Sequence, residues 1–178
     1  MNSVAASLFP DLEGHWFASH RADPRAAALY RRHYSAEKNA RPGVIRDLNF
    51  MGPGECLVLL TADCRALFAW QRNVGAPRLD RQDGVCCTVF RNEGPVLSSD
   101  LIREADDIAW RRWPGERLFT YVWPAKLRST NPGACFKKAG WRTCGRNADG
   151  RLTILEIYPT PQAAREQQVT ERQAGGKR

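Results

Sequence analysis

The feature that most constrains the fold is a change of hydrophobic period between residues 85 and 124. The run VCCTVFR at 85–91 is apolar and β-branched, which is typical of a central strand. After a loop with a glycine, apolar residues recur at helical spacing: Leu101, Ile102, Ala105, Ile108, Ala109 and Trp113. We expect Asp106, Asp107, Arg111 and Arg112 on the opposite, polar face of this helix. The run RLFTYVWP at 117–124 is again a strand, so the chain predicts a mixed sheet with helices between some strands.

Further elements extend this pattern in both directions. Strand-like runs lie at 44–51, 55–62, 65–72, 141–146 and 151–159. Only Asp63 and Cys64 separate the runs 55–62 and 65–72, so these two are expected to be antiparallel neighbours. Asp23 followed by Pro24 predicts the start of a helix that runs through Tyr30. The expected fold class is α/β of the α+β kind, with residues 16 and 17 packed onto the body.

The stretch NPGACFKKAGW at 131–141 specifies both ends of a short helix. Asn131 is expected to cap it, and Pro132 suits the first helical turn. Lys137 near the other end is favoured by the helix dipole, and Gly140 supplies a left-handed C-terminal residue. Trp141 then begins the next strand and is expected to pack back on the helix.

Length and composition indicate one folded domain. The chain of 178 residues is 43% hydrophobic, which is sufficient for a substantial core. We assign residues 1–160 to that domain and 161–178 to a polar, mobile tail. No apolar run is long enough to cross a membrane and the first residues do not resemble a signal peptide, so a cytoplasmic location is expected.

The cysteines and the charge indicate which kinds of site and partner to expect. Six cysteines occur without a CxxC pair, so buried free thiols are favoured over disulfides or a zinc site, and no metal is predicted. The formal net charge of +8 and the excess of Arg over Lys favour a polyanionic partner. The alternative is a basic charge that is simply spread over the surface.

The junction FRNEGPVLSSD at 90–100 is a candidate anion site. It joins a strand to the first turn of a helix, where free N–H groups and the helix dipole favour anionic oxygens. Pro95 removes one of these donors. The alternative is an ordinary strand-to-helix connection capped by serine.

The order strand, R-x-x-G loop, helix, strand and NPGACFKKAGW resembles the second half of the GNAT (GCN5-related N-acetyltransferase) acyltransferase fold, over about residues 44–158. The family's phosphate loop reads Arg/Gln-x-x-Gly-x-Gly/Ala, and this chain has Arg91, Gly94 and then Val96. A family segment of the type Asn…Ala…Tyr-x-x-x-Gly-Phe aligns with residues 131–141. The resemblance implies a mixed, mostly antiparallel central sheet flanked by helices.

The resemblance also implies an acetyl-CoA site. The thioester would lie where the strands 85–91 and 117–124 splay apart, and the pyrophosphate would meet the N–H groups of residues 92–99. A strand N–H near Val89 would polarise the carbonyl. Residues implied in cofactor binding are Val89, Phe90, Arg91, Gly94, Val96, Leu97, Ser98, Ser99, Asn131, Phe136 and Lys137.

Two positions depart from the family pattern. Val96 stands where a small residue normally lets the backbone approach the phosphate. Phe136 stands where many members keep a Tyr that protonates the leaving thiolate. Another acid or a water molecule must then serve, or the donor is different.

The motif HYS at 33–35, ahead of the sheet, is similar to the Mom-type GNAT-like proteins of phages, which modify DNA bases. This resemblance implies acylation of an amino group on a modified base in phage DNA, in a bacterial host or phage-infected cell. His33 is then the candidate base, Tyr34 the candidate acid or substrate contact, and Ser35 completes the catalytic set.

Contacts to DNA are expected from side chains outside that motif. Candidates for substrate or nucleic-acid contact are Arg41, Arg46, Arg72, Tyr121 and Trp123, with Arg78 and Arg81 as further phosphate contacts. Trp16, Trp70 or Trp123 would stack on an extruded base. Glu55 is an alternative, water-linked base. Two other functions stay open: acyl transfer to a small-molecule or protein amine, and a non-catalytic basic module that binds nucleic acid.

Overall fold

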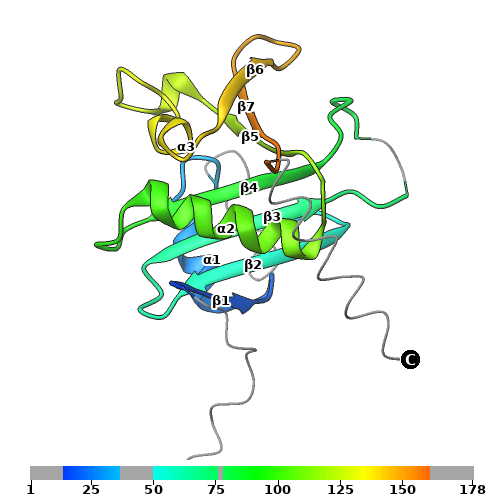
Figure 1. Cartoon of the computed structure of the whole chain (residues 1–178). Coiled ribbons are helices and arrows are strands. Elements are labelled where there is room, and N and C mark those ends of the chain that lie inside the picture. The colour runs from blue at the N-terminus through cyan, green and yellow to red at the C-terminus, as the bar shows by residue number, and fades with distance from the viewer. Residues whose placement is uncertain (1–13, 37–49, 76–77, 161–178) are drawn as a thin grey trace, which may run out of the picture.

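The computed structural model describes residues 14–36, 50–75 and 78–160 (Figure 1). The strands are β1 (Trp16–Ser19), β2 (Glu55–Thr61), β3 (Ala66–Arg72), β4 (Val85–Asn92), β5 (Leu118–Val122), β6 (Arg142–Arg146) and β7 (Thr153–Ile157). The helices are α1 (Pro24–Arg31), α2 (Ser98–Arg112) and α3 (Ala134–Lys138), with a 3₁₀ turn η3 at Pro124–Lys126. The arrangement is a mixed α/β fold.

The strands form one seven-stranded sheet in the order β1-β2-β3-β4-β5-β7-β6. Every neighbouring pair is antiparallel except β4 and β5, which are parallel and are joined through α2. This confirms the predicted α+β class with a mostly antiparallel sheet. Parallel neighbours need a crossover connection, and the amphipathic helix predicted at this place supplies it.

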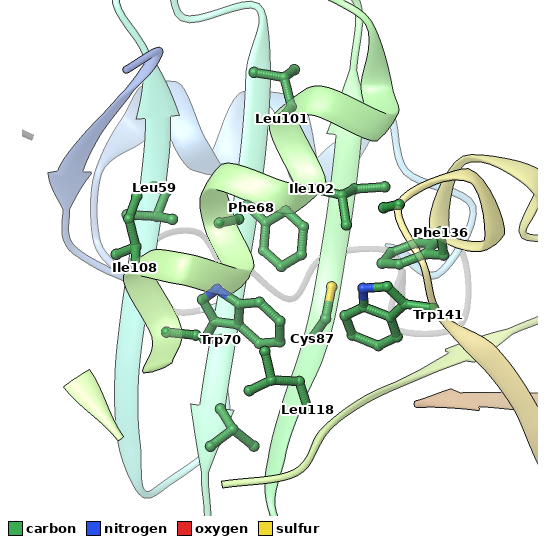
Figure 2. Packing of buried hydrophobic residues seen from close by; sticks show 14 of the residues in the cluster. Leu59, Phe68, Trp70, Cys87, Leu101, Ile102, Ile108, Leu118, Phe136 and Trp141 are labelled. Carbon is green, nitrogen blue, oxygen red and sulfur yellow. The ribbon is translucent and has the colours of Figure 1, made fainter. Parts of the chain in front are cut away.

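The two faces of the sheet are covered by different helices (Figure 1). Helix α2 lies across one face, where Leu101, Ile102 and Ile108 meet Phe68 and Trp70 (Figure 2). Helix α1 covers the other face, where its buried residues join a second cluster: Ala26 and Leu29 with Val58, Leu60, Leu67, Ala69 and Val89. The alternation of side chains along β2 and β3 supplies both clusters.

A β-bulge in β4 changes which residues share a face. Trp70 pairs with Cys87 and Ala69 pairs with Val89, which leaves Thr88 as the extra residue. Cys87 and Phe90 therefore both join the α2 side, although they are three positions apart. Val89 joins the α1 side.

Trp16 and Phe17 pack onto the body as predicted, and residues 16–19 also form an edge strand that the sequence did not indicate, because β1 pairs with β2 from Trp16↔Thr61 to Ser19↔Val58. Two other predictions need correction. The run 44–51 lies largely outside the described residues, and Phe50 and Met51 are not in a strand. Asp106 is buried, 2% exposed, instead of lying on the polar face of α2.

The short helix begins later than predicted. Gly133, with φ +75°, is its N-terminal flanking residue, so Asn131 is not the cap. The left-handed φ favours glycine at position 133, and a Cβ there would also lie 2.7 Å from Leu155 Cδ1. The other end agrees with the prediction, because Gly140 has φ +104°. Trp141 packs edge-on against Phe136 with ring centroids 5.0 Å apart.

Candidate functional site

The strands β4 and β5 part in the middle of the sheet. Their parallel pairing runs from Val85↔Leu118 to Cys87↔Thr120 and stops there. Both strands continue, β4 to Asn92 and β5 to Val122. Along this stretch the β5-facing edge of β4 has no strand partner among the described residues, so its backbone groups are available to a ligand.

A cavity of about 380 Å³, which we call the cleft, lies at this opening. Its lining comes from the end of α1, both parting strands and the α3 region: His33, Tyr34, Ser35, Gln71, Arg78, Cys86, Cys87, Thr88, Phe90, Thr120, Tyr121, Val122, Trp123, Leu127, Gly133, Cys135, Phe136 and Leu152. The structure thus brings together the HYS motif and five residues predicted elsewhere in the chain: Arg78, Phe90, Tyr121, Trp123 and Phe136.

His33 is a buried, neutral imidazole at the cleft wall. Its Nδ1 lies 2.7 Å from Ser35 Oγ and accepts from the Ser35 backbone N–H at 3.3 Å. Because a backbone N–H can only donate, the neutral ring carries its proton on Nε2, and the Ser35 hydroxyl donates to the same Nδ1 lone pair at the shorter distance. Burial, with the Arg91 charge second, lowers the pKa of His33 to about 4. The pair therefore has the arrangement of a hydroxyl activated by a neutral base.

Tyr34 projects toward the parting strand β5. Its hydroxyl donates to the Tyr121 carbonyl oxygen at 3.4 Å, and its ring lies 4.2 Å from the His33 ring, centroid to centroid. Burial raises the pKa of Tyr34 above its ordinary value. The phenol is therefore protonated at neutral pH and is a proton donor within the cleft.

The opposite wall is apolar and rigid. Phe136 packs on Trp141 (Figure 2) and on Phe90. The Trp141 indole N–H donates to Asp106 Oδ2 at 2.9 Å. Burial raises the pKa of Asp106 well above its usual value. The thiols of Cys87 and Cys135 complete this wall, and burial raises the pKa of each, so they are protonated and are poor nucleophiles.

Tyr121 is held by a different group at the cleft edge. Its hydroxyl donates to Asp80 Oδ2 at 2.6 Å, and Arg78 donates to the same carboxylate at 2.7 Å. These bonds lower the pKa of Asp80, the contact with Arg78 contributing most. Tyr121 thus fixes the loop between β3 and β4 against β5.

The junction at 91–99 lies apart from the cleft, and its polar side chains are used internally. Glu93 accepts from Arg91 at 2.5 Å and from Arg32 at 2.8 Å, and these two arginines lower the pKa of Glu93 to about 2. The Asn92 amide donates to Ser98 Oγ at 3.0 Å. The side chain of Arg91 is therefore not free to bind an anion.

The backbone of the same junction remains available. Leu97 flanks α2 and accepts from the N–H groups of residues 100 and 101. The N–H groups of Ser98 and Ser99 have no acceptor among the described residues, as expected for a first helical turn. Gly94 and Val96 line a second cavity of about 270 Å³, near the turn between β2 and β3. Leu97 is exposed and Ser99 is buried.

The remaining predicted residues are dispersed. Asn131 Oδ1 accepts from Lys137 Nζ at 2.8 Å on the surface. Arg72 pairs with Glu116 at 2.8 Å, outside the cleft lining. Val89 packs on the α1 side of the sheet. Arg41 and Arg46 lie outside the described residues.

Two predicted groups are excluded by burial or by their contacts. Trp16 and Trp70 are 2% and 0% exposed in the core, so neither can stack on an extruded base. Glu55 accepts from the Trp113 indole at 2.6 Å and does not line the cleft, so it is not a base for this site.

Sequence reasoning did not single out Cys87, Thr88, Thr120 or Cys135, whose place on the cleft wall depends on the bulge and on the parting of the strands. No cluster of His, Cys, Asp and Glu suited to a metal ion occurs within residues 14–36, 50–75 and 78–160. Over the same ranges, no helix has the length and apolar character needed to span a membrane.

Comparison with known proteins adds no relative to this description. No family model matches the chain, and neither the curated proteins nor the solved structures contain a match.

Proposed function

We propose that this protein is a GNAT-type N-acyltransferase that uses acetyl-CoA and acts on an amino group of a modified base in phage DNA. The observation that carries the proposal is the cleft where β4 and β5 part, because it joins an opened sheet edge to the His33–Ser35 pair and to Tyr34. An acyltransferase needs a place for a thioester, a base and an acid, and this cleft offers candidates for all three.

The residues present suit acetyl-CoA as the donor substrate. Phe90, Phe136 and Leu127 give the cleft an apolar wall for the acyl end. The unpaired edge of β4 beyond Cys87 supplies backbone donors for a thioester oxygen. At the far end of β4, the first turn of α2 supplies N–H groups and a positive dipole end for a pyrophosphate.

The proton transfers follow from the hydrogen bonds in the cleft. As the acceptor amine attacks the thioester carbon, Ser35 Oγ takes the amine proton and passes its own to His33 Nδ1. The new C–N bond forms and the C–S bond breaks. Tyr34 gives its phenolic proton to the departing thiolate sulfur, in the role that Phe136 lacks. His33, neutral at the start, ends the step protonated.

DNA as the acceptor is supported by charge. The formal net charge of +8 favours a polyanion over a neutral amine, and arginines lie at the cleft edge and on the neighbouring loop. A small-molecule or protein amine is the second candidate acceptor, since the lining of the cleft does not by itself distinguish such an amine from a DNA base. A non-catalytic basic module that binds nucleic acid is the third.

The experiment combines acyl-CoA binding with product analysis. Acetyl-CoA should raise the thermal unfolding midpoint of the protein, since a ligand that binds only the folded state stabilises it. Phage DNA with an amino-bearing base, incubated with protein and acetyl-CoA, should yield acylated nucleosides by mass spectrometry. Acylated small amines beside unmodified DNA would select the second candidate. Salt-dependent DNA binding with no response to acyl-CoA would select the third.

A further inference from the structure

A tight turn at residues 78–81 stands at the edge of the cleft. The Arg81 N–H donates to the Arg78 carbonyl oxygen at 3.0 Å, which closes the turn, and Arg81 has φ +57°. Leu79 and Asp80 are the two central residues. Arg78 and Tyr121 both line the cleft, so the turn begins at its wall.

The base of this turn is rigid. The Asp80 carboxylate accepts from the Arg78 guanidinium at 2.7 Å, from the Tyr121 hydroxyl at 2.6 Å and from the Gln82 N–H at 3.1 Å. The Arg78 guanidinium also lies over the Phe119 ring, 5.3 Å from its centroid. The turn is thus fastened to β5 at two points, the Tyr121 hydroxyl and the Phe119 ring, while Arg78 and Gln82 hold the same carboxylate from within the loop.

This rigid base presents a fully exposed apolar side chain. Leu79 is 105% exposed, more than Val74 at 62%, Leu97 at 62% or Tyr158 at 49%, the other exposed large apolar residues of the described chain. In the chain it follows Arg78, whose guanidinium is bound to Asp80, and it precedes Asp80 and Arg81. This leucine is carried by a fastened turn beside the cleft, so it lies where a large molecule bound at the cleft would meet it.

We propose that Leu79 is a wedge that enters the base stack of duplex DNA and fills the space left when the target base turns into the cleft. This inference rests on the proposed action on DNA. A base inside a duplex cannot reach a recessed site, so it must be extruded, and apolar side chains inserted between base steps lower the cost of unstacking. The exposed Arg81 would meet a neighbouring phosphate, and the basic net charge of the chain favours DNA as a polyanion.

The test compares duplex with single-stranded DNA as acceptors. Because Leu79 packs on nothing, L79S should fold like the wild type. We expect it to lose about tenfold or more of its acylation rate on the duplex, the size of the effect of leaving a leucine unburied. On the same strand without its complement, where no base needs to be extruded, the rate should stay within about twofold.

V74S is the matched control, because it removes an exposed apolar side chain from the same loop, outside the turn and the cleft lining. It should leave both rates unchanged. Equal losses of L79S on duplex and single strand, or no loss on either, would overturn the wedge and leave the acyltransferase proposal standing. Absence of DNA acylation by the wild type would instead count against the proposed function.

A second measurement needs no catalysis. A duplex with one 2-aminopurine becomes more fluorescent when that base unstacks. Wild-type protein at saturating concentration and low salt should raise the fluorescence, and L79S should bind with similar affinity by anisotropy while producing little rise. Binding by the wild type without a rise, or an equal rise with L79S, would contradict the wedge.

Discussion

The cleft and the 91–99 junction make an informative comparison, since both contain polar residues beside a strand end. In the cleft, Ser35 and His33 bond to each other and face open space. In the junction, the side chains of Arg91, Asn92 and Glu93 are already taken up by bonds to neighbouring groups: Arg91 and Arg32 bond to Glu93, and Asn92 bonds to Ser98. The first region keeps side-chain chemistry available, whereas the second offers only its backbone.

The difference shows that a motif's letters do not reveal which atoms are free. An arginine after a strand reads as an anion ligand, yet Arg91 bonds to Glu93 and to the carbonyl oxygen of Arg32. Its contribution is to join the end of β4 to the end of α1. The HYS segment follows α1 directly, so these bonds help to position the cleft wall.

The largest expected effect is the loss of the proposed proton relay between Ser35 and His33. S35A and H33Q should each lower kcat by about 10²-fold or more, because each removes one member of a general-base pair. Binding of acetyl-CoA should persist, as measured by thermal shift. S129A, a change of an exposed serine outside both regions, is the control and should retain full activity. If S35A kept the wild-type kcat, Ser35 would have no role in the proton transfer.

The next effect is on stability below neutral pH. The pKa of His33 is lowered to about 4 in the folded protein, against about 6.5 when unfolded, so the unfolded chain binds more protons between these values. The free energy of unfolding should therefore fall as pH drops from about 6.5 to 4, by at most about 3 kcal/mol from this group. Urea unfolding of the wild type and H33Q at pH 7, 5.5 and 4 measures it. Parallel profiles would mean that His33 is not buried in its neutral form.

A smaller loss of activity is expected for the acid. Y34F keeps the ring on His33 and removes only the hydroxyl, so kcat should fall at least about tenfold while the fold is retained. A sharper readout comes from acyl donors whose leaving thiol is more acidic. Such a thiolate leaves without a proton from Tyr34, so Y34F should recover most of its lost kcat with these donors. Y158F, at an exposed tyrosine beyond β7, is the control. An unchanged kcat would assign thiolate protonation to water.

The smallest expected effect tests the junction's backbone. Ser98 is the first residue of α2, where proline is well tolerated, and Leu97 before it has φ −62° and ψ 129°, which suits a pre-proline residue. S98P thus removes one N–H with little cost to the helix and should raise the KM for acetyl-CoA about tenfold at unchanged kcat. S98A keeps the N–H and should bind like the wild type. Equal KM values for S98P and S98A would mean that the Ser98 N–H does not bind acetyl-CoA.

Much of the fold could be predicted from periodicity and punctuation. The strand run at 85–91, the helix through residue 112 and the turn at Gly140 agree with the structure because each is encoded by neighbours along the chain. The edge strand at Trp16 was missed, since four residues carry too short an alternation to read. Asp106 was predicted on the polar face of the helix because helical spacing carries no information about its bond to the indole of Trp141, which is distant in the chain.

The candidate site was less predictable. The HYS motif and Phe136 were singled out through a resemblance, and their meeting in one cleft depends on contacts across the sheet. Tyr121 was expected to contact the substrate, but its hydroxyl bonds to Asp80, a residue of another loop. Such pairings join positions far apart in the chain, so no local pattern encodes them.

By itself, the sequence determined the kinds and order of the helices and strands from residue 55 onward and the basic charge, because these follow from residue type and spacing. Only the tertiary structure decided where the sheet opens. The bulge at Thr88 and the end of pairing after Cys87 depend on three strands meeting at once. That meeting separates residues with free chemistry from residues whose groups are already satisfied, since hydrogen-bond partners are chosen by position in space.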